Sequence, residues 1–398
     1  MISQEEDETI TRADVQSNPK IRLVDSDDSN NIQLFCYDTC DANDEEIVKI
    51  SRGIVFSGDT LVMKSFPFTI DYTEKENHEE IHSLLHNNIC SIFDSFEGAL
   101  LRMFFYNNKW YLSTNRKLDA YKSRWASRTT FGELFNQALQ YEFITNEIFR
   151  KNLGGGDVVS EEEKQAIGDI MNRFLNALDT RKQYMFLLLN NYENRIVCRY
   201  DHPKFLHVGT FIDGNLSLQH ENIGLDYPKQ HLFESIDEMY HYVNTLDWNL
   251  LQGLIIFGPN NKQYKILNPT YIHLCKIRGN ESSIKFRYLQ LRNDTEKKEA
   301  LRKLYPEWSA TFDAYDLHII EICNNILQAY INRYIRKIFV TLPLEQFIIM
   351  SEVHKWHVLD RENNKINLAI IHQTMNLQKP TSINQMVKKF ILEKKKND

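Results

Sequence analysis

The sequence predicts an α+β protein in which a domain of mixed, mainly antiparallel β-sheet precedes an all-helical C-terminal domain. Short aromatic and β-branched runs, separated by turn residues, dominate to about residue 285, and apolar residues at helical spacing dominate afterwards. The chain has 398 residues, 42% of them hydrophobic, enough for two domains with separate cores. We therefore expect an N-terminal arm at 1–30, a sheet domain at 31–285 and a helical domain at 286–398.

The first thirty residues are polar and acidic. Such a composition buries too little apolar surface to offset the entropy of ordering, so we expect a mobile acidic arm with one short strand at most. The acidic residues of this stretch are Glu5, Glu6, Asp7, Glu8, Asp25, Asp27 and Asp28.

The sheet domain is predicted from runs that favour strands, interrupted by one helical stretch. A turn at Tyr106–Lys109 joins two strands into a hairpin, residues 129–150 have helical spacing, and Ser160 with Glu163 forms a capping box for another helix. The predicted strands are Ile32–Tyr37, Gly53–Phe56, Thr60–Ser65, Ala99–Phe105, Lys109–Ser113, Tyr184–Leu189, Ile196–Tyr200, Phe205–Phe211, Leu254–Phe257 and Gln263–Leu267.

The helical domain is predicted from one long apolar stripe. Its members follow one another at intervals of three or four residues: Phe312, Tyr315, Ile319, Ile322, Ile326, Tyr330 and Tyr334. Because this spacing places them on one helix face, the helix must pack against partners. Further helices are predicted at 343–356 and after Ser382.

Composition excludes several classes of protein. The net charge of −7 argues against binding long nucleic acid over the whole surface, although a local basic pocket remains compatible with it. No apolar run approaches the roughly 20 residues of a membrane span, and no signal-peptide pattern opens the chain. The six cysteines form no Cys-x-x-Cys pair, so reduced, mostly buried thiols in a cytoplasmic protein without membrane partners are expected.

Five short segments occur in an order and spacing that resembles the phage RNA ligase 1 type of covalent nucleotidyltransferase. The resemblance covers most of residues 45–355, including the helical tail. Its segments are Ser51-Arg52-Gly53-Ile54-Val55-Phe56, Phe93-Asp94-Ser95-Phe96-Glu97-Gly98-Ala99-Leu100, Asn194-Arg195-Ile196-Val197 with Tyr200, Leu251-Gln252-Gly253-Leu254-Ile255-Ile256, and Tyr264-Lys265-Ile266-Leu267-Asn268-Pro269.

The resemblance implies a site that has lost its catalytic groups. In this family a lysine in a Lys-x-Asp-Gly turn attacks the α-phosphate of a nucleotide, while carboxylates and further lysines hold the metal and phosphates. Here the four essential positions hold Ser95, Leu188, Gln252 and Leu267. Only Glu97, Gly98 and Lys265 keep the expected chemistry, so no catalytic residue and no metal ligand is predicted.

The emptied cleft is still expected to bind a nucleotide. Cations would contact phosphate, Glu97 the base or ribose, and an aromatic ring would stack on the base, for which stacking contributes about 1–3 kcal/mol. Core packing is the ordinary role of strand aromatics, and Arg116 and its neighbours also fit a solvated face. The candidate binding residues are Arg52, Phe96, Glu97, Trp110, Arg116, Lys117, Tyr200 and Lys265.

One further motif has a familiar spacing. His78-Glu79-Glu80-Ile81-His82, extended by His86, fits the His-Glu-x-x-His pattern of zinc proteases and would place three imidazoles on one helix face. The segment is polar and lacks a distant third ligand, so a surface helix is the preferred interpretation.

Three functions follow. The first is a non-catalytic RNA ligase-like protein that binds an RNA 5′ end, an mRNA cap or a purine nucleotide and presents it to protein partners in an RNA-processing or translation complex. The second is an active ATP-dependent RNA repair ligase, and the third is a scaffold with a vestigial cleft. No cofactor is expected beyond a bound purine nucleotide, with Mg²⁺ required only by the ligase. Richness in Asn, Ile, Lys and Tyr hints at a viral source with an AT-rich genome.

Overall fold

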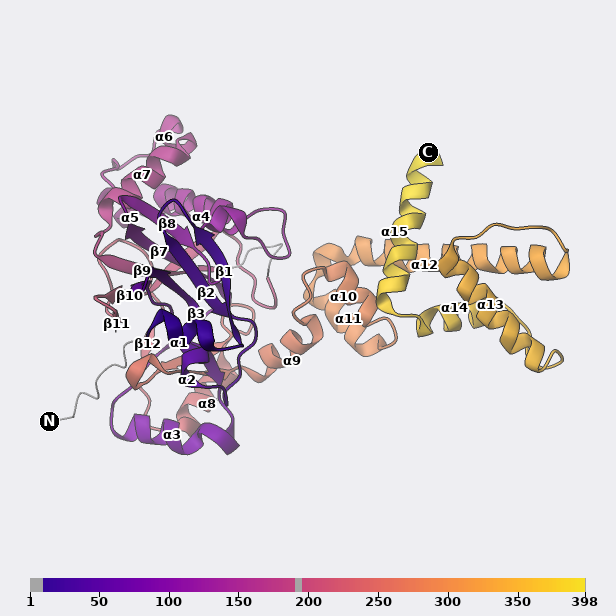
Figure 1. Cartoon of the computed structure of the whole chain (residues 1–398), viewed down its shortest axis with the longest axis horizontal. Helices are drawn as coiled ribbons and strands as arrows, with labels where there is room; N and C mark the ends of the chain where they lie inside the picture. The colour runs from indigo at the N-terminus through magenta and orange to yellow at the C-terminus, as the bar shows by residue number, and fades with distance from the viewer. Residues whose placement is uncertain (1–9, 190–194, 398) are drawn as a thin grey trace. The chain divides into compact units, whose positions relative to one another are not determined.

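The computed structural model describes residues 10–189 and 195–397, and divides the chain into two compact units, Met1–Ile272 and His273–Asp398. The first unit holds the strands and the second is helical, as the sequence predicts (Figure 1). The units divide earlier than the expected boundary after residue 285, because helix α9, Pro269–Arg278, already begins the helical part of the chain.

The first sheet lies near the N-terminus and has the order β1-β2-β3-β4, all antiparallel. Its strands are β1 (Ile21–Asp27), β2 (Ile32–Tyr37), β3 (Arg52–Ser57) and β4 (Thr60–Met63). Helices α1 (Arg12–Ser17) and α2 (Glu46–Ile50) pack on it, and Val15 and Ile21 are buried. The expectation of a mobile arm is therefore wrong for the described residues 10–30, because buried apolar side chains hold them; residues 1–9 lie outside the described part.

Two five-stranded sheets form the centre of the unit. One has the order β11-β10-β9-β7-β8 and the other β12-β6-β13-β14-β5, in which only β14 and β5 pair in parallel. The first comprises β7 (Gly98–Tyr106), β8 (Lys109–Ser113), β9 (Lys182–Leu189), β10 (Lys204–Ile212) and β11 (Asn215–Ser217). The second comprises β5 (Thr69–Asp71), β6 (Ser91–Ser95), β12 (Gln230–His231), β13 (Gly253–Phe257) and β14 (Gln263–Leu267).

Three apolar clusters organise these sheets into layers. One fills the space between the β7–β9–β10 sheet and helices α4 (Phe131–Thr145) and α7 (Ile167–Ala177). Another lies between the β6–β13–β14 sheet and helices α3 (Glu74–His86) and α8 (Ile236–Thr245). The third, with Phe93, Phe104 and Phe257, joins the inner faces of the sheets. The remaining helices of this unit are α5 (Glu147–Asn152) and α6 (Glu161–Gln165), which begins at the predicted Ser160–Glu163 capping box.

One predicted strand is absent. The described residues 195–203 form neither helix nor strand, although Ile196–Tyr200 was predicted as a strand. Their β-branched residues favour an extended backbone, but the amides of residues 196–198 donate to a buried carboxylate instead of to a neighbouring strand. A side-chain acceptor has thus replaced strand pairing.

The helical unit is built around α12, Ser309–Tyr330, which continues into a π-helical turn, η4, Ile331–Ile335. The predicted stripe is buried from Phe312 to Tyr330 and packs on α13, α14 and α15. The other helices are α10 (Ile284–Gln290), α11 (Thr295–Leu304), α13 (Leu344–Leu359), α14 (Leu368–Leu377) and α15 (Pro380–Asn397). Within the described residues, no helix is both long and apolar enough to cross a bilayer.

A core substitution tests this packing. Ile322→Ala empties a fully buried site on α12 and should lower the free energy of unfolding by about 2–5 kcal/mol. Ile320→Ala is the control, since that side chain on the same helix is 44% exposed and should cost well under 1 kcal/mol. Urea denaturation followed by circular dichroism measures both, and equal effects would contradict the assigned buried face.

Candidate functional site

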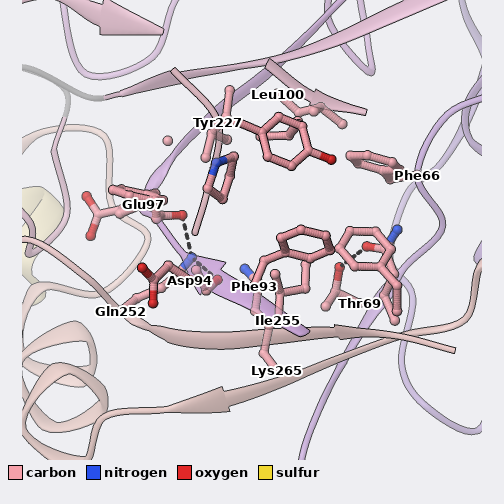
Figure 2. A pocket seen from close by; sticks show the side chains of 18 of the residues that line it. Phe66, Thr69, Phe93, Asp94, Glu97, Leu100, Tyr227, Gln252, Ile255 and Lys265 are labelled. Atoms are coloured by element: carbon pink, nitrogen blue, oxygen red, sulfur yellow. Dashed lines mark hydrogen bonds between the residues drawn. The ribbon is translucent and has the colours of Figure 1, made fainter. Parts of the chain in front are cut away.

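A cavity of about 310 Å³ lies where the two five-stranded sheets face each other (Figure 2). Its walls come from strands β6, β13 and β14 on one side and from β7, β9 and β10 on the other, with β3 and β5 contributing at the rim. This volume is at the lower end of the roughly 300–1,000 Å³ typical of small-molecule sites. The cavity is therefore large enough for a compact ligand.

The walls of the cavity are rich in aromatic rings. Phe93 lies 5.8 Å from Tyr227 and 5.9 Å from Phe257, and Phe66 lies 5.6 Å from Phe257, all in edge-on geometry. Figure 2 shows Tyr227 and Leu100 on the side opposite Phe93 and Ile255. These walls suit a flat apolar group such as a purine base.

Two cations line the same cavity. Arg52 comes from β3 and Lys265 from β14, and Nη1 of Arg52 donates to the carbonyl of Pro67 at 3.2 Å. Lys265 faces the cavity because strand side chains alternate: Gln263 and Lys265 point inward, whereas Tyr264 and Ile266 belong to the cluster under α3 and α8. Both predicted phosphate contacts are thus brought to one site.

A buried arginine fixes the rim beside Arg52. Arg102, on β7, donates to the carbonyls of Gly53 and Thr114, the residues next to Arg52 and Asn115. Gly53 has φ +94°, and a Cβ there would lie 2.6 Å from Nη1 of Arg102, so only glycine fits. Burial lowers the pKa of Arg102 to about 9. The glycine of the first motif is therefore required by this contact.

Two amide atoms in the cavity wall lack a partner. Among the described residues, Nε2 of Gln263 and Oδ1 of Asn115 are buried without a hydrogen bond, while Oε1 of Gln263 accepts from the Thr69 hydroxyl at 3.1 Å. A buried polar group without a partner costs about 1–3 kcal/mol. A ligand with both a donor and an acceptor would remove this cost.

Ser95 and Gln252, the residues matched to the family's nucleophile and fourth-motif carboxylate, form a neutral pair. Nε2 of Gln252 donates to Oγ of Ser95 at 3.0 Å and to the carbonyl of Phe96 at 2.6 Å, and both side chains are buried. A glutamate at Gln252 would place a carboxylate against that carbonyl. The amide is therefore chemically matched to the serine-containing turn.

The structure corrects the residue assigned to the third motif. Leu187, not Leu188, lines the cavity on β9, while Leu188 belongs to the cluster under α4 and α7. Strand alternation sends neighbouring residues to opposite faces, so the ungapped match was one residue out of register. Both residues are leucine, so a carboxylate is absent at either position.

Glu97 has a different role from the predicted contact with a base or ribose. Its carboxylate accepts the backbone N–H groups of Ile196 at 2.6 Å, Val197 at 2.8 Å and Cys198 at 3.2 Å, and the hydroxyl of Tyr271 at 3.1 Å. The side chain is buried, and both of its oxygens are engaged. Glu97 thus holds the 196–198 segment, and Ile196 of that segment lines the cavity.

The eight predicted binding residues divide into two groups. Arg52, Phe96, Glu97 and Lys265 line the cavity. Trp110 instead packs against Phe105 and Tyr184, its ring centroid 5.3 and 6.5 Å from theirs. Trp110 lies outside the cavity because side chains alternate along β8: Tyr111 faces the cluster between the sheets, whereas Trp110 faces the cluster under α4 and α7.

The other three make contacts elsewhere. Arg116 donates to the carbonyls of Tyr37 at 2.9 Å and Asp38 at 3.2 Å, and Nζ of Lys117 lies 3.4 Å from Asp25. The Tyr200 hydroxyl donates to the carbonyl of Leu250 at 2.8 Å, and burial raises its pKa. Asn194, part of the same motif as Tyr200, lies outside the described residues.

Several lining residues were not predicted. Gln263 had a usable signal, since it lies two residues before Lys265 on the same strand face. Asn115 lies next to Arg116, so the basic stretch pointed to the correct rim but to the wrong side chain. Tyr227 comes from an irregular segment with no periodic signal.

The three histidines of the His-Glu-x-x-His segment lie on a helix, in agreement with the interpretation preferred from the sequence. His78, His82 and His86 stack along α3 with ring centroids about 6.5 Å apart, and Nδ1 of His78 hydrogen-bonds the Tyr72 hydroxyl at 2.9 Å. Across the described chain, no three His, Cys, Asp or Glu side chains are grouped to hold a metal ion.

The role of Glu97 can be tested by an isosteric change. Glu97→Gln replaces one accepting oxygen by an N–H₂ group that faces backbone donors, and should lower the free energy of unfolding by about 1–3 kcal/mol. Tyr271→Phe removes a single bond and should cost about 0.5–1.5 kcal/mol. Glu147→Gln, at an exposed glutamate, is the control. Thermal unfolding measures all three, and a neutral Glu97→Gln would show that the contacts are dispensable.

Comparison with known proteins identifies relatives. No family model matches the chain. It is 27% identical over 383 residues to the immediate-early protein ICP-46 homologue of Invertebrate iridescent virus 6, covering 90% of this chain and 81% of the relative. It is 25% identical over 252 residues to a protein of Autographa californica nuclear polyhedrosis virus named as a bifunctional polynucleotide kinase/RNA ligase, covering 58% of this chain and 32% of that protein.

Among solved structures, an Aquifex aeolicus protein named as an ATP-dependent DNA ligase aligns with 76% of this chain and 78% of its own, at 10% identity and a TM-score of 0.39. The baculovirus match supports the resemblance that the motifs indicated. The chain is thus similar to viral ICP-46 proteins over most of its length and, over more than half of it, to a protein of the RNA ligase type.

Proposed function

We propose that the cavity binds a purine nucleotide, either free or as the 5′ end or cap of an RNA, and that it does so without forming a covalent adduct. The observation that carries this proposal is the combination of aromatic walls with Arg52 and Lys265 in one enclosed site. Rings recognise the base by stacking, and cations attract the phosphates.

Two buried polar atoms without a hydrogen bond support recognition of a purine base. Gln263 offers a donor and Asn115 an acceptor, and the edge of a purine base presents groups of both kinds. A cap would add roughly 0.5–2 kcal/mol, because a methylated guanine is positively charged and attracts aromatic faces. The name of the baculovirus relative agrees with an RNA-related function.

The Ser95–Gln252 pair supports the non-catalytic part of the proposal. A serine hydroxyl is a weak nucleophile unless a base takes its proton, and here it accepts a hydrogen bond from a neutral amide. Removal of one group that stabilises the phosphates typically raises a barrier by about 2.7–4 kcal/mol, and several such groups are absent. In this proposal, recognition has been kept and group transfer lost.

Incubation with labelled ATP or GTP and Mg²⁺ tests the absence of transfer. We expect no labelled band after denaturing electrophoresis, because no lysine occupies the nucleophile position. The variant Ser95→Lys should also remain unable to join RNA ends, since Gln252 and Leu187 supply no carboxylate. An acid-labile adduct on the unmodified protein would favour the active ligase, with its need for Mg²⁺.

Calorimetry with ATP, GTP, a cap analogue and 5′-triphosphate RNA tests binding. Lys265→Ala should make the binding free energy of the preferred ligand less favourable by about 1.5–3 kcal/mol, because a charged contact to phosphate is lost. The salt dependence of binding should also decrease. Lys262→Ala is the matched control. It removes the same charge from the residue immediately before β14, where Lys262 pairs with Glu80. If none of the four ligands binds at high concentration, a scaffold with a vestigial cleft is the better description of the protein.

A further inference from the structure

The helical unit carries a charge opposite to that of the whole chain. Residues 273–398 hold 21 lysine and arginine residues against 14 aspartate and glutamate residues, whereas the chain as a whole holds 47 against 54. A net positive region within an acidic protein indicates an anionic partner for that region. Cations without a salt-bridge partner in this unit are candidates for contacts with such a partner.

A compact group of rings marks one such location. The rings of Tyr334, on η4, and His354, on α13, stack with centroids 3.7 Å apart and planes inclined by 16°. Tyr330 lies 4.9 Å from Tyr334, and its hydroxyl is 3.2 Å from Nδ1 of His354. These contacts fix the junction between the end of α12 and the second half of α13.

Cations surround this stack. Arg333 lies over the Tyr334 ring at 5.7 Å and over the Phe347 ring at 5.2 Å. Lys337 follows the end of η4 by two residues, and Arg361 follows the end of α13 by two residues. Burial lowers the pKa of His354, and the charges of His357, Arg361 and Lys337 lower it further. Within the described residues, no carboxylate forms a salt bridge with Arg333, Lys337 or Arg361.

An exposed ring completes the surface. Phe339 follows Lys337 by two residues in an irregular segment, and its side chain is 86% exposed. The ring is thus accessible to a partner and lies close in sequence to a cation. We call this group the Tyr334 surface: Arg333, Tyr334, Lys337, Phe339, His354 and Arg361.

We propose that the Tyr334 surface binds single-stranded RNA, with Lys337 and Arg361 on phosphates and Phe339 stacked on a base. Cations can contact the phosphates of a single strand, and an exposed ring can stack on one of its bases. The site belongs to the helical unit and does not depend on the nucleotide cavity. Binding here would let the protein hold the body of an RNA independently of its 5′ end.

The salt dependence of RNA binding tests the ionic part. The probe is a fluorescent single-stranded RNA with a 5′-hydroxyl, titrated with the full chain between low and moderate salt. The double variant Lys337→Ala/Arg361→Ala should reduce the slope of log K against log salt by about 1.4, since each phosphate contact on a single strand contributes about 0.7. Lys303→Ala/Lys379→Ala removes the same charge from α11 and the start of α15 and should leave the slope nearly unchanged.

A ring substitution separates RNA from a lipid surface. Phe339→Leu keeps an apolar side chain but loses the ring, so it should weaken RNA binding about fivefold or more without changing the salt slope. Leu377→Ala, at another exposed apolar residue, is the control and should have no effect. Binding to phosphatidylserine vesicles that survives Phe339→Leu, with no binding to RNA, would overturn the proposal in favour of a lipid.

Two further outcomes decide the matter. Equal loss of slope in both double variants would overturn the proposal, because it would mean diffuse attraction to the whole unit. Lys265→Ala should retain full affinity for the 5′-hydroxyl RNA, so failure of the nucleotide cavity and failure of this surface are distinguishable. Circular dichroism of each variant should match that of the unmodified protein, since all substituted side chains are exposed or partly exposed.

Discussion

The buried carboxylate of Glu97 is the interaction on which the cavity between the two five-stranded sheets most depends. It lies in the turn between β6 and β7 and accepts hydrogen bonds from three successive backbone amides of residues 196–198 and from Tyr271. Among the described residues no strand pairs with residues 196–198, so the carboxylate takes the part that a neighbouring strand's carbonyls would otherwise play. One side chain thereby joins the start of β7, an irregular segment and the beginning of α9. The same contacts explain why an acidic residue is present beside a serine that has no evident catalytic role.

Glu97, Gly53 and Gln252 each make contacts that maintain the form of the site. Gly53 is needed because Arg102 lies against it, and Arg102 fixes the rim that carries Arg52 and Asn115. Gln252 is needed because its amide donates to Ser95 and Phe96. Each of these residues supports the walls of the cavity. Motif residues thus contribute structural contacts, whatever ligand the cavity takes.

Much of the fold was accessible from the sequence because periodicity reports directly on burial. Aromatic and β-branched runs identified β2, β7, β13 and β14, and the three-four spacing from Phe312 to Tyr330 identified the buried face of α12. The N-terminal arm was mispredicted because polar composition outweighed a few buried side chains such as Val15 and Ile21. The strand at 196–200 was mispredicted because β-propensity carries no information about a distant carboxylate that captures the backbone. Both errors come from long-range contacts.

The site shows the same limit more sharply. Arg52, Phe96, Glu97 and Lys265 line one cavity because the order of the motifs fixes which strands are neighbours. Trp110 was included as an aromatic residue near the matched segments and Tyr200 as part of the match to the third motif, and neither lines the cavity. The register of β9 determines which of its residues faces the cavity. Leu187 lines the cavity, and the next residue, Leu188, lies in the core. A period of two makes such an error reverse the face of a strand completely. Gln263 could have been found from its place two residues before Lys265 on the same strand face. The direction of the Asn115 side chain, in contrast, follows from tertiary packing, and no sequence pattern indicated it.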